Sequence, residues 1–129
     1  MSRQIVKTDA APAAIGPYSQ GVIVTGGRTL YSSGQIALDP ATMQMVGDGD
    51  VEAEAEQVMK NLEAVLAAAD MDFSHVVRAT IFLSDMGNFA KVNAIYEKRF
   101  ANDPPARACV QAAMLPKGAL VEIDVVAVA

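Results

Sequence analysis

The chain has 129 residues, a formal net charge of −5 and 52% hydrophobic residues. This length fits one compact domain, so we expect residues 1–129 to form a single domain without linkers or repeats. The acidic balance, with no cluster of Lys and Arg, argues against nucleic-acid binding. No apolar run approaches the length of a membrane span, and residues 1–8 show no export signal. The single cysteine, Cys109, fits a reducing compartment, so we expect a cytoplasmic protein.

The amino-terminal part predicts short strands separated by glycine-rich turns. We expect them at 3–8, 22–24 and 29–36. The last two are expected to pair with each other, because Gly26 and Gly27 form a turn between them.

The next segment, 51–69, carries apolar residues at helical spacing and predicts an amphipathic helix. Asp50 is the expected N-cap. Glu52, Glu54 and Glu56 suit the positive end of the helix dipole, and we interpret them as a solvated face rather than a metal site.

The carboxyl-terminal part predicts a strand at 76–83, a helix at 89–100 and two further strands starting near Ala106 and Ala119. Pro104 and Pro105 prevent the helix from continuing. This order of elements predicts an α+β fold, in which a mixed β-sheet has both helices packed on one face.

Arg107 is the most informative residue for function, because it lies at the mouth of a short apolar strand. A guanidinium has a planar fork of donors and a permanent charge, which suits the binding of a small carboxylate. Glu122 interrupts the last strand, where an ionised carboxylate is costly unless it is paired or functional. If the two last strands form a hairpin, Arg107 and Glu122 could instead be a structural ion pair.

Two motifs of small residues lie upstream. Residues 16–21 (GPYSQG) combine a rigid turn with a tyrosine hydroxyl and an amide. Residues 32–36 (SSGQI) end an apolar run with hydroxyls and a glycine, where backbone N–H groups could approach a ligand.

Together these motifs resemble the RidA (YjgF) family of small enamine/imine deaminases over essentially the whole chain. The resemblance is carried by residues 14–21, 33–36, 92–97, 105–107 and 115–123, which follow the family's order and spacing. It implies a chorismate-mutase-like fold and a homotrimer with a central β-barrel and ligand clefts between subunits.

The resemblance also implies an activity, the hydrolysis of 2-imino acids such as 2-iminobutanoate and 2-iminopropanoate to 2-oxo acids and ammonia. Arg107 would hold the substrate carboxylate, Glu122 would handle the water, and the backbone carbonyl of Cys109 would accept from that water. Four further residues match family positions that line the cleft: Tyr18, Ser33, Gly34 and Asn93. No metal or cofactor is expected, because an iminium carbon is already electrophilic.

Some sequence features depart from this interpretation or compete with it. Ala108 and the Gln111-Ala112 pair differ from common family residues, although neither change touches the proposed chemistry. His75 is interpreted as a surface residue and the Cys109 thiol as inert. A trimer that binds small carboxylates or protects other proteins without turnover remains an alternative, as does an endoribonuclease or translation inhibitor, which the acidic balance disfavours.

Overall fold

The computed structural model describes residues 2–100 and 102–129. The elements follow in this order: β1 (Ser2–Val6), β2 (Gly21–Thr25), β3 (Thr29–Tyr31), α1 (Val51–Ala68), β4 (Val76–Leu83), α2 (Phe89–Glu97), β5 (Ala106–Gln111) and β6 (Val121–Val128). Short 3-10 turns precede β4, α2 and β6.

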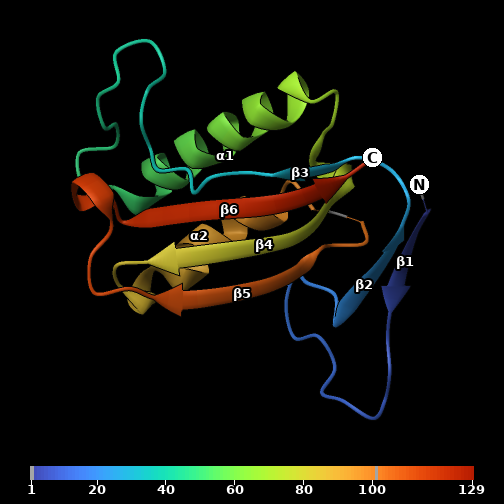
Figure 1. The fold of residues 1–129 in the computed structure, drawn as a ribbon. Helices are drawn as coiled ribbons and strands as arrows, with labels where there is room; N and C mark the ends of the chain where they lie inside the picture. Colours follow the sequence, from blue (N-terminus) through green and yellow to red (C-terminus); the bar gives the residue numbers. More distant parts are fainter. Residues whose placement is uncertain (1, 101) are drawn as a thin grey trace.

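The main sheet has four strands in the order β3-β6-β4-β5. β4 runs antiparallel to β6 and parallel to β5, so the sheet is mixed. Both helices lie on the same side of this sheet (Figure 1). The predicted α+β layout with two helices on one face is therefore confirmed.

A separate two-stranded sheet is formed by β1 and β2. The expected pairing of 22–24 with 29–36 is wrong, because β2 pairs along its whole length with β1. After β2 the chain turns through Gly26 and Gly27, both in the left-handed region that favours glycine. Arg28 and Ala129 then exchange two backbone hydrogen bonds, of 2.6 and 3.0 Å, so β3 pairs with β6 rather than with β2.

The segment after β3 continues along β6 with one irregularity. Ser32 donates its N–H to Val125 (2.9 Å), and Gln35 donates its N–H to Ile123 (2.8 Å). Ser33 and Gly34 therefore stand opposite a single β6 residue, which is the arrangement of a β-bulge. This bulge ends the regular strand and presents the Ser33–Gly34 backbone to β6.

Helix α1 begins as predicted, since the side chain of Asp50 accepts the N–H of Glu52 at 3.0 Å. Its apolar stripe packs into the core between helix and sheet. The solvated role of Glu54 is wrong: its side chain is buried and accepts the N–H of Leu120 at 2.9 Å. Glu54 thereby joins the first turn of α1 to the start of β6.

The turn at residues 16–20 is anchored to the proline pair before β5. Ser19 donates its backbone N–H to the carbonyl of Pro105 (3.1 Å) and its hydroxyl to the carbonyl of Pro104. Ser19 is itself buried. This contact carries Tyr18, far away in the sequence, to the start of β5.

Candidate functional site

Arg107 projects toward the helices from the edge strand of the main sheet. It pairs in register with Ala79, a buried residue of β4, so both side chains lie on the helix-covered face. Its Nη1 donates to Oδ1 of Asn93 on α2 at 2.6 Å. Sheet edge and helix together fix the orientation of the guanidinium.

Three aromatic rings surround this guanidinium. Its Cζ lies 5.1 Å from the ring centre of Tyr96, 5.5 Å from that of Tyr18 and 5.6 Å from that of Phe89. Within residues 2–100 and 102–129, no carboxylate oxygen lies within 4.0 Å of Arg107. The cation is thus held in place without being neutralised by the chain that the structure describes.

Glu122 lies on β6, in register with Phe82 of β4. Its immediate neighbour is the bulge: a Cβ added to Gly34 would lie 2.8 Å from Cδ and 3.0 Å from Cγ of Glu122. Only a glycine leaves room for the carboxylate against this backbone. The structure therefore places Ser33, Gly34 and Glu122 together.

The expected hairpin between the last two strands is wrong, and with it the structural Arg107–Glu122 pair. β4 lies between β5 and β6, because β5 enters the sheet parallel to β4. Arg107 shares the register of Ala79, whereas Glu122 shares that of Phe82, three residues further along β4. Since strand side chains alternate between faces, the two side chains lie on opposite faces of the sheet.

Cys109 lies two residues after Arg107 on the same face. Burial raises the pKa of its thiol, and the nearby Arg107 opposes this shift only in part. A thiol with a raised pKa is a poor nucleophile at neutral pH. This agrees with the inert thiol expected from the sequence.

Phe89 and Tyr96 are site neighbours that the sequence analysis did not single out. With Asn93 they occupy positions i, i+4 and i+7 of α2, which places all three on one helix face. That spacing was available in the sequence. The same spacing is equally typical of residues that pack in a core, and only the position of Arg107 indicates that these side chains belong to the site.

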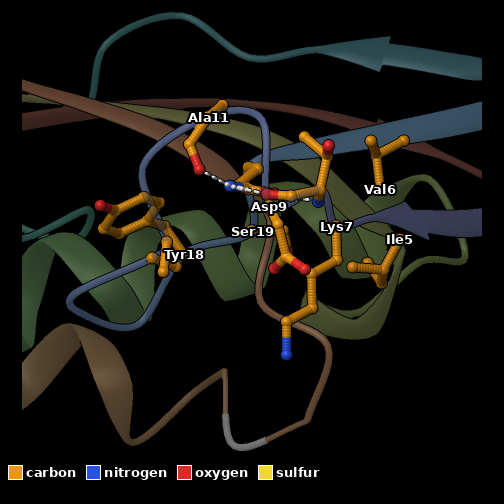
Figure 2. A pocket seen from close by; sticks show the side chains of 11 residues that line it. Ile5, Val6, Lys7, Asp9, Ala11, Tyr18 and Ser19 are labelled. Carbon is orange, nitrogen blue, oxygen red and sulfur yellow. Dashed lines mark hydrogen bonds between the residues drawn. The ribbon is translucent and has the colours of Figure 1, made fainter.

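A hollow of about 410 Å³ is lined by residues between Ile5 and Gln20, Tyr18 among them (Figure 2). The Gln20 amide holds its loop by donating to the carbonyls of Thr8, Ala11 and Pro12. Tyr18 thus lines this hollow and also lies beside the Arg107 guanidinium.

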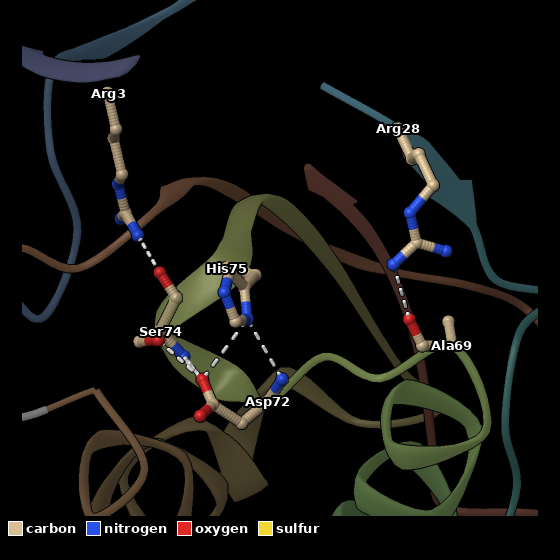
Figure 3. A network of polar contacts seen from close by, with 6 residues as sticks. All are labelled: Arg3, Arg28, Ala69, Asp72, Ser74 and His75. Carbon is tan, nitrogen blue, oxygen red and sulfur yellow. Dashed lines mark hydrogen bonds and ion pairs between the residues drawn. The ribbon is translucent and has the colours of Figure 1, made fainter. Parts of the chain in front are cut away.

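His75 has a structural role. Its Nδ1 accepts the backbone N–H of Asp72 at 3.0 Å and lies 3.3 Å from the Asp72 carboxylate, forming a capping box (Figure 3). Arg3 of β1 donates to the carbonyl of Ser74 in the same turn. This imidazole lies in a structural turn of the chain.

No group of three or more His, Cys, Asp or Glu side chains within residues 2–100 and 102–129 is arranged to hold a metal ion. Nor does the described part of the chain contain a helix long and apolar enough to cross a membrane.

The fold and the arginine define a class: small α+β proteins with a mixed sheet, two helices on one face and, on the edge strand, an arginine surrounded by aromatic rings. The chain belongs to the RidA family, since the family described as Endoribonuclease L-PSP matches residues 8–129. Protein DfrA of Myxococcus xanthus is 60% identical over 99% of this chain and 97% of its own length. The 2-iminobutanoate/2-iminopropanoate deaminase of Mus musculus is 52% identical over 98% of this chain and 91% of its own length. RidA of an Antarctic Psychrobacter has a TM-score of 0.75 at 41% identity, covering 98% of this chain and 99% of that one.

Proposed function

We propose that this protein hydrolyses small 2-imino acids, such as 2-iminobutanoate and 2-iminopropanoate, to 2-oxo acids and ammonia. The observation that carries this proposal is Arg107, oriented by Asn93 and left without a carboxylate partner among the described residues. A small carboxylate ligand would neutralise the guanidinium charge and accept its free N–H groups. The similarity to the mouse deaminase supplies the reaction class.

In the proposed mechanism Arg107 holds the substrate carboxylate and so fixes the imine carbon in place. Glu122 takes a proton from a water molecule whose oxygen adds to that carbon. The backbone carbonyl of Cys109 accepts the other hydrogen of this water. Glu122 then returns its proton to the carbinolamine nitrogen and becomes ionised again. As the C–N bond breaks, the carbinolamine oxygen forms the C=O bond of the 2-oxo acid and its hydroxyl proton passes to solvent, while the nitrogen leaves as ammonia.

Arg107 and Glu122 can meet only if two copies contribute, because one sheet separates them within a chain. We therefore propose a composite site in a cyclic homotrimer with a central barrel. Tyr18, Asn93, Arg107 and Cys109 come from one copy, whereas Ser33, Gly34 and Glu122 come from its neighbour.

The helix-free face of the sheet supports this assembly. It carries apolar side chains, including Tyr31 at 75% and Val110 at 44% exposure. Such side chains on an uncovered sheet are typical of a subunit interface.

Complementation between two inactive variants tests the composite site. Arg107→Ala and Glu122→Gln are each expected to lose turnover, by roughly two orders of magnitude for Arg107→Ala. If the two co-expressed variants assemble at random, each mixed trimer has one intact site of three, which is about a quarter of all sites in the population. About a quarter of wild-type turnover should therefore return.

Coupling imine generation by an amino-acid oxidase to detection of the 2-oxo acid measures this turnover, and native mass spectrometry verifies the mixed trimers. Arg28→Ala and Glu63→Gln are matched controls, since they remove the same charges from exposed residues away from the helix-free face: Arg28 donates to the carbonyl of Ala69 at the end of α1, and Glu63 lies on α1. Mixed trimers no more active than their parents would refute the composite site, and an inactive wild type would refute the deaminase.

Carboxylate binding without turnover is the second candidate, because Arg107 would serve it equally. No comparable observation favours the endoribonuclease activity named in the family description. The chain has 15 acidic and 10 basic residues, a balance that disfavours binding to the phosphates of RNA. We propose a cytoplasmic location, because a single free cysteine fits a reducing compartment.

A further inference from the structure

We propose that Phe89 and Tyr96 are positioning residues that hold the Arg107 guanidinium by their ring faces, so that its full charge stays available to an anionic ligand. This inference rests on the proposed function in one respect, namely that Arg107 binds a carboxylate. It concerns how the chain holds a half-buried arginine that has no carboxylate partner among the described residues.

A half-buried guanidinium normally needs a compensating group. A carboxylate would provide it but would compete with the ligand for the same donors. Aromatic ring faces attract a cation through their quadrupole without accepting its N–H groups. Three rings between 5.1 and 5.6 Å from Cζ therefore stabilise the charge and leave it unneutralised.

The donors of the guanidinium are unequally occupied. Nη1 is engaged by Asn93 at 2.6 Å. Nη2 lies toward Gly16, where even an added Cβ would come no closer than 3.5 Å. Asn93 thus sets the plane of the fork, and the missing side chain at residue 16 leaves space beside Nη2.

The ring of Tyr96, rather than its hydroxyl, performs this role. Tyr96 is 1% exposed, and among the described residues its buried Oη has no hydrogen-bond partner. An unsatisfied hydroxyl is costly, so packing alone would favour phenylalanine here. Tyr96→Phe keeps the face over Arg107 and should preserve ligand binding.

Phe100 supplies a matched control. Its ring packs against Tyr96 with centroids 4.5 Å apart, and it is buried at 6% exposure. It is not among the rings that Arg107 overlies. Phe100→Leu therefore perturbs the same region of the core without touching the cation.

The test compares Phe89→Leu, Tyr96→Leu, Tyr96→Phe and Phe100→Leu in the full chain. Calorimetric titration with 2-oxobutanoate should show binding about tenfold weaker for Phe89→Leu and for Tyr96→Leu. Tyr96→Phe and Phe100→Leu should stay within about twofold of wild type. In turnover assays, Phe89→Leu and Tyr96→Leu should raise KM more than they lower kcat.

An independent readout is the NMR signal of the Arg107 Nε–H group. Ring currents of the three surrounding aromatic side chains, here called the aromatic cage (Tyr18, Phe89 and Tyr96), shift this signal upfield. Phe89→Leu should move it downfield without any ligand present, and Phe100→Leu should not. This signal tests the cage even if wild type fails to bind 2-oxobutanoate, an outcome that would count against the proposed function alone.

Wild-type affinity in Phe89→Leu, or equal loss in Phe100→Leu, would overturn the proposal. If Tyr96→Leu fails to fold, the comparison of Phe89→Leu with Phe100→Leu still decides it, because Phe89 is only half-buried.

Discussion

Substituting Gly34 by alanine should displace the Glu122 carboxylate while leaving the fold intact. The new Cβ would lie 2.8 Å from Cδ and 3.0 Å from Cγ of Glu122, whereas carbon atoms pack at about 3.5–4.0 Å. The side chain must therefore retreat by roughly 1 Å. A misplacement of that size can cost on the order of 100-fold in turnover.

The effect on stability should be small. The backbone of Gly34 is not in the left-handed region, so alanine adds no strain there. Glu122 is half-buried on the helix-free face and can swing away, which limits the cost to below about 1 kcal/mol. Affinity for 2-oxobutanoate should persist, because Arg107 is untouched.

The assay pairs turnover with thermal denaturation and calorimetric binding. Gly21→Ala is the matched control, since its Cβ would meet only Val6, at an ordinary 3.6 Å. The reasoning fails if Gly34→Ala turns over imines as fast as Gly21→Ala. It also fails if the loss of turnover merely follows a loss of folded protein.

The remaining predictions concern single side chains. Glu122→Gln should lower kcat by about 10²- to 10⁴-fold with unchanged melting temperature and 2-oxobutanoate affinity, and loss of stability would contradict the absence of an Arg107–Glu122 pair. Cys109→Ala should retain most turnover, because only its backbone is used, and iodoacetamide should modify Cys109 more slowly than free glutathione. Burial raises the pKa of the Glu54 carboxyl above its usual 4.5, although hydrogen bonds from the backbone at Leu120 and Val121 partly oppose this shift. The folded protein therefore binds a proton at Glu54 more tightly than the unfolded chain does. The stability that this protonation contributes is fully present below pH 4.5 and is lost as pH rises through the raised pKa of Glu54. The melting temperature of wild type minus that of Glu54→Gln should therefore increase on acidification. A difference that does not change with pH would refute this reasoning.

The parts of the fold that the sequence predicts well are those in which local pattern and tertiary packing agree. The strand expected at 76–83 matches β4, and the helix expected at 51–69 matches α1 to within one residue. Alternating apolar residues in the strand, and Asp50 with the helical stripe in the helix, encode these elements locally. Neither depends on which strand lies beside which.

Glu54 shows where local pattern misleads. Acidic residues in a first helical turn are usually solvated, and the sequence gives Glu52 and Glu54 the same reading. Only the return of the chain at Leu120 distinguishes them, since its N–H needs an acceptor inside the protein. A contact between residues so far apart in the chain has no local signature.

The relation between Arg107 and Glu122 is the most consequential feature that the sequence could not provide. Two strands joined by a short turn usually form a hairpin, and a hairpin would make these residues neighbours. Because β5 instead joins β4 in parallel, the cation faces the helices and the carboxylate faces the bare side of the sheet. An ion pair within one chain would have neutralised both groups. Their separation leaves each charge unpaired within the part of the chain that the structure describes, and under the proposed mechanism a second copy would bring the Glu122 carboxylate and its water to Arg107.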